Sequence, residues 1–195
     1  MVLAQNIAGN ITGIDLCPDL ITVFNDHAKK LNLGERVTGI VGSIEELSFP
    51  KEEFDLIWSE GLIDSIGFGK GLTYWNGFLK KDGYVAVTCP TWLTDERPEE
   101  VEKFWADAGS GLDSVGNNIA AMHKTGYSFV ASFVLPENCW DNYFIPREAA
   151  GKALLEKYPG NQTVAAYLED DKHEVALYSK YKQHYGYVFY IGKKI

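Results

Sequence analysis

The stretch that decides the fold is ITGIDL, residues Ile11–Leu16. It is a short apolar run with β-branched residues, bounded by Gly9 on one side and Pro18 on the other, which predicts a buried strand. Pro18 suits the first turn of a helix, and apolar residues then recur at helical spacing until Gly34. A strand followed directly by a helix therefore starts the pattern.

The same alternation continues along the chain. It predicts strands at 36–41, 54–59 and 84–89, with a short helix at 44–47 and a longer one at 69–80. Beyond Pro90 it predicts helices at 99–106, 114–125, 147–158 and 163–183, strands at 129–135 and 185–191, and an aromatic loop at 139–144. Alternating strands and helices indicate an α/β fold of the Rossmann-like, doubly wound kind, with a mostly parallel sheet and helices on both faces. With no repeat or linker, residues 1–195 are expected to form one domain.

Composition narrows the class of protein. The chain has 195 residues, 46% of them hydrophobic, and 18 basic against 27 acidic residues give a net charge of −9. Basic residues are nowhere more than two in a row, so a nucleic-acid partner is not expected. The acidic run at 169–171 is expected to be a solvated helix face. No window approaches the roughly 18 apolar residues of a membrane span, so no membrane partner is expected.

The three cysteines point to a compartment rather than to a site. Cys17, Cys89 and Cys139 lie far apart in apolar surroundings, which excludes a disulfide framework and a Cys-x-x-Cys metal knuckle. The histidines also lack metal spacing, and no metal is expected. We expect a reducing, cytoplasmic location.

Ligands of an open α/β sheet sit outside the carboxyl ends of the strands. Asp15 ends the first predicted strand, at the position where a fixed carboxylate accepts the hydroxyl protons of a nucleoside ribose. The alternative is a structural one, in which Asp15 caps the helix that begins near Pro18.

Aromatic residues gather at or after the predicted strand ends. Trp58, Trp92, Trp140 and Tyr143 are candidates for a substrate pocket, and the helical and aromatic segment 91–160 is expected to cover that pocket as a cap. Such a cap excludes water and binds an apolar or cationic ligand through ring faces. Ordinary packing in the core is the alternative for each ring.

Four successive motifs resemble those of class I S-adenosyl-L-methionine (SAM) dependent methyltransferases of the small-molecule type. They cover the first half of the chain and read ITGIDL at 11–16, RVTGIVGSIEELSF at 36–49, FDLIWS at 54–59 and FLKKDGY at 78–84. The resemblance implies a methyl transfer from SAM to a small molecule by in-line displacement. It also implies that the last strand is antiparallel.

The resemblance assigns roles to residues of this chain. Asp15 would hold the ribose, Leu16 would pack on the adenine, and Ser43 and Ile44 would lie at the edge of the base. Ser59 would line the floor under the methyl group. Members of the family often carry an acid where this chain has Ser43.

Glu60 is the candidate catalytic residue. It directly follows the strand end that the resemblance places under the SAM sulfonium, where a carboxylate orients an acceptor proton or offsets the cationic centre. The alternative is that Glu60 only caps the next helix.

The first strand of the family and its glycine-rich loop have no counterpart in the chain and would precede Met1. Since that strand lies between those predicted at 11–16 and 54–59, two inner strand edges are expected to be unpaired. A chain beginning at Met1 should then bind SAM poorly or borrow a strand from a second copy, as a homodimer. Two other functions stay open, a nicotinamide-dependent oxidoreductase and a non-catalytic interaction domain with the same sheet.

Overall fold

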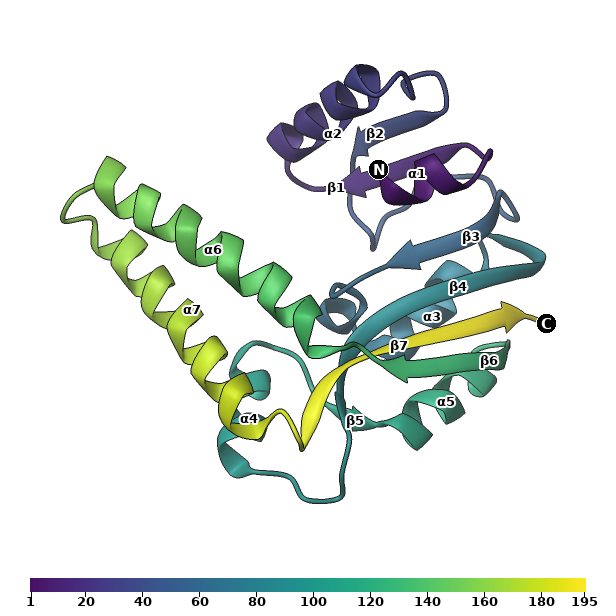
Figure 1. The fold of residues 1–195 in the computed structure, drawn as a ribbon. Coiled ribbons are helices and arrows are strands. Elements are labelled where there is room, and N and C mark those ends of the chain that lie inside the picture. Colours follow the sequence, from purple (N-terminus) through teal and green to yellow (C-terminus); the bar gives the residue numbers. More distant parts are fainter. The chain divides into compact units, whose positions relative to one another are not determined.

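A computed structural model describes all residues, 1–195, and its contacts divide the chain into two compact units, Met1–Pro50 and Lys51–Ile195 (Figure 1). The first unit holds, in order, helix α1 (Val2–Asn6), strand β1 (Ile11–Asp15), helix α2 (Pro18–Lys30) and strand β2 (Val37–Val41). β1 and β2 are parallel, with Asp15 opposite Val41 at their carboxyl ends.

The first unit follows the sequence prediction closely. Pro18 is in the first turn of α2, which buries Ala28 against Val37 of β2 and Ala4 of α1. The short helix expected at 44–47 is wrong, because these residues form only a turn after β2.

The second unit is built on a five-stranded sheet. Its elements are β3 (Phe54–Ser59), the 3-10 helix η1 (Ile63–Ile66), α3 (Phe68–Asn76), β4 (Leu79–Trp92), α4 (Glu99–Asp107), β5 (Asp113–Ser114), α5 (Val115–Lys124), β6 (Tyr127–Val134), α6 (Glu137–Lys157), α7 (Gln162–Tyr181) and β7 (Tyr185–Lys194). The strand order is β3-β4-β7-β6, with β5 beside β4. β3 and β5 are parallel to β4, whereas β7 is antiparallel to both of its neighbours. The predicted antiparallel last strand is confirmed.

Two pairs of helices accompany the second sheet in different ways. α3 and α5 contact β4, β6 and β7, and the core between them includes Leu72, Val85, Met122 and Tyr190. α6 and α7 form an antiparallel hairpin that extends away from the sheet (Figure 1). At its base an aromatic core joins the hairpin to α4 and to the adjoining ends of β4 and β7; its buried members are Trp92, Val101, Trp105, Trp140, Leu177 and Tyr185. The predicted α/β, Rossmann-like class is confirmed. None of the helices has the length and apolar character that crossing a membrane requires.

Two predictions in this unit are wrong. The helix expected to continue to residue 80 ends at Asn76, and β4 starts at Leu79, because Leu79 pairs with Phe54 and Asp82 bends the strand with a φ of 62°. The aromatic loop expected at 139–144 is instead the start of α6. Pro146 lies inside this helix, although a proline in that position usually marks a helix boundary.

Both sheets end in strands with an unpaired edge. β1 is hydrogen-bonded only to β2, and β3 only to β4. Within its own unit, each of these strands therefore has one hydrogen-bonded neighbour.

Candidate active site

The carboxyl end of the first sheet brings together four of the predicted cofactor residues. Asp15 ends β1, and its Oδ1 accepts a hydrogen bond from the Cys17 backbone N–H at 2.8 Å. This contact fixes the carboxylate and leaves Oδ2 available to a ligand hydroxyl. Leu16, the next residue, is 72% exposed.

The loop after β2 lies at the same end of this sheet. The Gly42 N–H donates to the Asp15 carbonyl oxygen at 3.0 Å, which brings Ser43 and Ile44 to the end of β1. The Ser43 hydroxyl accepts the Glu45 N–H at 3.1 Å. Asp15 thus makes the local cap-like contact of the structural alternative and also occupies the end of a parallel strand, as a ribose ligand must.

The second unit contains a cavity of about 300 Å³ at the carboxyl ends of β3 and β4, which we call the aromatic cavity. It is lined by Glu60, Gly61, Thr88, Leu135, Cys139, Trp140, Tyr143, Glu174 and Tyr187. These residues come from the loop after β3, from β4 and β7, from the connection between β6 and α6, and from the two helices of the hairpin. Three of the predicted site residues, Glu60, Trp140 and Tyr143, meet here.

The loop that carries Glu60 is held in place at both of its sides. The Trp58 indole N–H donates to Glu60 Oε1 at 2.6 Å, and the Gly61 N–H donates to the Thr88 hydroxyl at 2.8 Å. Gly61 has a φ of +61°, a conformation that suits glycine, and its open side faces the Tyr187 ring. The backbone turn therefore aims Glu60 at the cavity.

The four predicted pocket aromatics separate into two groups. Trp140 and Tyr143 line the cavity, with Trp140 stacked on Tyr178 at a centroid distance of 3.8 Å. Trp92 is 3% exposed in the aromatic core. Trp58 is 42% exposed on β3, where it positions Glu60 without lining the cavity.

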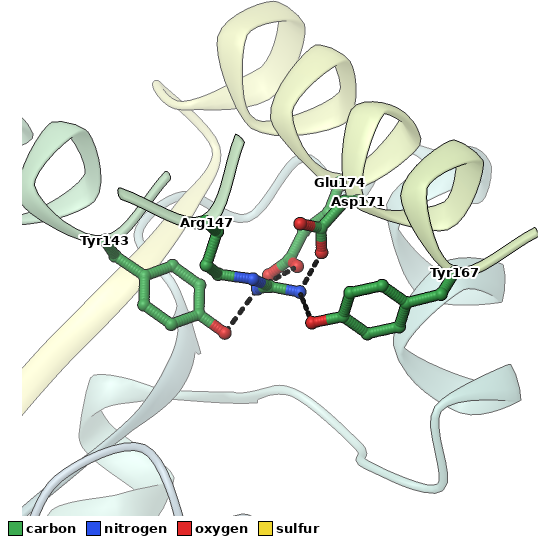
Figure 2. Close-up of polar contacts among 5 residues, drawn as sticks. All are labelled: Tyr143, Arg147, Tyr167, Asp171 and Glu174. Atoms are coloured by element: carbon green, nitrogen blue, oxygen red, sulfur yellow. Dashed lines mark hydrogen bonds and ion pairs between the residues drawn. The ribbon is translucent and has the colours of Figure 1, made fainter. Parts of the chain in front are cut away.

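Arg147 connects α6 to α7 beside the cavity. Figure 2 shows its guanidinium between the hydroxyls of Tyr143 and Tyr167 and the carboxylates of Asp171 and Glu174. Asp171 makes the closer ion pair, and Glu174 accepts a longer bond of 3.3 Å. Burial raises the pKa of the Glu174 carboxyl above its ordinary value, and the nearby guanidinium only partly offsets this effect.

The acidic face of α7 is therefore not uniformly solvated. The prediction is wrong for Asp171, whose side chain is only 11% exposed, and Glu174 on the next turn is 18% exposed. Glu169 does face solvent, with 76% of its side chain exposed beside Lys172. Arg147 on the other helix is the reason, because it draws the two inner carboxylates toward α6.

A second cavity of about 470 Å³ lies among η1, α5 and the end of β4, and its wall includes Asp64, Cys89 and Asn118. Behind it is a buried polar network, in which the Asn118 amide donates to the Tyr190 hydroxyl at 3.2 Å and the Thr91 hydroxyl lies 3.1 Å from the same oxygen. This cavity contains none of the predicted site residues. No three side chains of the types that bind metals are grouped in the structure.

Thr88, Glu174 and Tyr187 are among the cavity residues that were not identified from the sequence. Thr88 and Tyr187 belong to apolar strands whose pattern indicates burial only, and Glu174 belongs to the acidic face described above. The pairing of β4 with β7 places Thr88 and Tyr187 at the cavity, and Glu174 beside it contacts Arg147.

Comparisons with known proteins identify methyltransferases as similar in sequence and in fold. Residues 1–87 match the family model of a methyltransferase domain. No curated protein matches the sequence. Among solved structures, a SAM-dependent methyltransferase of Geobacter sulfurreducens in complex with S-adenosyl-L-homocysteine has a TM-score of 0.84 at 18% identity, over 100% of this chain and 79% of that one.

Two further structures show how far the likeness extends. YjhP of E. coli has a TM-score of 0.83 at 19% identity, over 100% of this chain and 80% of that one. The cyclase SpnF has a TM-score of 0.77 at 18% identity, over 99% and 68%. Since SpnF is described as a cyclase, the shared fold does not by itself decide the reaction. This chain thus resembles class I SAM-dependent methyltransferases in sequence over residues 1–87 and in fold over its whole length.

Proposed function

We propose that this chain transfers a methyl group from SAM to a small neutral or cationic molecule bound in the aromatic cavity. The observation that carries the proposal is the position of Glu60. It follows β3 directly and lines the cavity together with Trp140 and Tyr143, in a chain with the fold of SAM-dependent methyltransferases. Leu135, Cys139, Trp140 and Tyr143 all belong to the segment 91–160, which supports its role as a cap over the acceptor.

The residues at the end of the first sheet fit the nucleoside part of SAM. A ribose offers two hydroxyl donors, and the Asp15 carboxylate, fixed through Oδ1, has acceptor positions left for them. Leu16 offers an exposed apolar side chain to the adenine, and Ser43 with Ile44 would contact the edge of the base. Ser59, at the end of β3, would lie under the methyl group.

When bound, SAM supplies an electrophilic methyl group on a sulfonium. The chain then has two tasks, to hold the acceptor atom in line at roughly 3–3.5 Å and to exclude water. Tyr143 and Trp140 would cover the acceptor, while the Glu60 carboxylate would orient its proton or offset positive charge. The net charge of −9 disfavours a polyanionic acceptor.

Ligand binding tests the cofactor assignment. In a form of the protein that includes the family's first strand and glycine-rich loop, SAM and S-adenosyl-L-homocysteine should raise the melting temperature, because a ligand at a hundredfold excess over its Kd stabilises the folded state by about 2.7 kcal/mol. Asp15→Asn should weaken binding about tenfold or more, because the ribose hydroxyls lose a charged acceptor. Asp26→Asn, an exposed position on α2, is the control and should bind like the parent. Unchanged affinity in Asp15→Asn would refute the ribose assignment.

Turnover tests Glu60 separately. Glu60→Gln keeps an oxygen for the Trp58 N–H and removes only the charge. We expect it to bind SAM normally and to form S-adenosyl-L-homocysteine more slowly with any acceptor found by screening. An unchanged rate would assign Glu60 a structural role.

The same titration separates the two alternatives. Stabilisation by nicotinamide dinucleotides and not by SAM would indicate an oxidoreductase. Stabilisation of that longer form by neither would indicate an interaction domain that keeps the sheet without the chemistry.

A further inference from the structure

The charge around the aromatic cavity is one-sided. Two of its nine lining residues, Glu60 and Glu174, are carboxylic acids, and none is Lys, Arg or His. The Glu60 carboxylate accepts only a neutral donor, the Trp58 indole N–H. No positive charge of the cavity wall compensates it.

Arg147 does not balance the remaining charge. Its single guanidinium is shared by two carboxylates, and the closer pair is with Asp171, which does not line the cavity. Glu174 receives the longer contact, at 3.3 Å. One cation against Asp171 and Glu174 leaves one negative charge in excess beside the cavity, and Glu60 adds a second.

The rest of the wall suits an organic cation. Trp140, Tyr143 and Tyr187 present aromatic surface, and rings of this kind attract cations through their negative faces. Tyr143 already does so in this structure, because the Arg147 guanidinium carbon lies 4.6 Å from the centre of its ring. Burial raises the pKa of Tyr187, so its hydroxyl stays neutral.

We propose that the acceptor is an amine that enters the aromatic cavity as its ammonium ion and is held between the carboxylates of Glu60 and Glu174. This proposal rests on the proposed methyl transfer and specifies its substrate class. The Glu174 side chain is only 18% exposed, and a partly buried carboxylate without a full counter-charge is costly; an ammonium ion would supply that charge through strong hydrogen bonds. The raised pKa of Glu174 is consistent with a carboxylate whose charge is only partly compensated.

The methyl transfer begins with a proton transfer. The ammonium ion gives one proton to the Glu174 carboxylate, which exposes the nitrogen lone pair. The nitrogen then forms a bond to the methyl carbon, and the carbon–sulfur bond breaks with its electron pair going to sulfur. A methylated ammonium ion and a neutral thioether result, and Glu174 returns its proton to water. A carboxyl with a raised pKa is a better proton acceptor than an ordinary one.

A matched pair of probes tests the charge preference without SAM. Phenethylamine is an ammonium ion at neutral pH, and phenethyl alcohol is its neutral counterpart of the same size. Titration calorimetry on the full chain should show the amine binding about tenfold more tightly than the alcohol. Equal or weaker binding of the amine, including no binding of either probe, would overturn the proposal.

Isosteric variants locate the preference. Glu174→Gln and Glu60→Gln should each weaken amine binding about threefold to tenfold and leave alcohol binding unchanged. Glu169→Gln, which is exposed on the same helix as Glu174, should behave like the parent. Circular dichroism identifies any variant that fails to fold, and the other variant then decides. If neither variant changes amine binding, the proposal is wrong.

These results are separable from those of the proposed function. The methyl-transfer proposal fails if SAM does not bind the form that includes the family's first strand and glycine-rich loop, or if S-adenosyl-L-homocysteine never forms there. The amine proposal fails on the calorimetry alone, whatever SAM does.

Discussion

Replacing Arg147 with methionine keeps most of the side-chain length and removes the charge that joins α6 to α7. Asp171 and Glu174 then stay close together with no cation between them. Hydrogen bonds to charged groups contribute about 1.5–3 kcal/mol each, and breaking a fully buried ion pair costs about 3–5 kcal/mol. The side chains of Arg147, Asp171 and Glu174 are 23%, 11% and 18% exposed, so solvent compensates part of this loss. We expect a net destabilisation of about 2–3 kcal/mol.

Urea unfolding followed by tryptophan fluorescence measures this change, since Trp140 lies at the base of the hairpin. With a slope of about 2 kcal/mol per molar urea, the midpoint should fall by about 1–1.5 M. Lys152→Met is the control, because Lys152 pairs with Glu148 on the exposed face of α6 and should matter by less than about 0.5 kcal/mol. Equal midpoints for the two variants would refute the reasoning.

The pH dependence gives an independent check on Arg147→Met. Burial already raises the pKa of Glu174 above its unfolded value, and loss of the guanidinium raises it further. A carboxyl with a raised folded pKa binds more protons in the folded state, so it favours folding increasingly as the pH falls through that pKa. The deficit of the variant should therefore shrink between neutral pH and about pH 5. A deficit that grows on acidification would contradict this.

Two further predictions concern the interior of the second unit. Tyr190→Phe removes the hydroxyl that forms hydrogen bonds with Asn118 and Thr91. It should lower the free energy of unfolding, measured by heat or urea, by about 1–3 kcal/mol because a buried donor loses its acceptor. A loss below about 0.5 kcal/mol would contradict this prediction. Burial raises the pKa of Cys89 to about 12, whereas Cys17 is exposed. At pH 8 about one Cys89 thiol in ten thousand is ionised, so a thiol reagent should modify Cys17 within minutes and Cys89 only after unfolding. Mass spectrometry of the digested protein measures the two labelling rates. Equal rates would refute the assignment.

Local sequence predicted the elements whose pattern and boundaries agree. Pro18 and the apolar spacing after it define α2, and the run FDLIWS defines β3 within its exact bounds. Residues 80–83 misled the prediction, since Lys-Lys-Asp-Gly resembles a helix end and yet lies inside β4, where pairing with β3 outweighs local preference.

The candidate site likewise contains residues that local sequence predicted and residues that it did not. Glu60 was predictable because it directly follows a strand in a parallel sheet, where ligands gather. Glu174 and Tyr187 were not, because their roles depend on contacts between segments far apart in the chain. No sequence motif around Arg147 indicated a role for it. Its role follows only from its contacts between α6 and α7.

The unpaired edges of β1 and β3 have a consequence for handling the protein. β3 is six residues long, with one charge and no proline, and Leu56 and Trp58 on it are 39% and 42% exposed. Open backbone donors and acceptors beside such side chains act as a template for further strands from other copies. Aggregation in concentrated solution should therefore begin at this edge, and a lysine in place of Leu56 should raise the solubility limit by making that pairing repulsive.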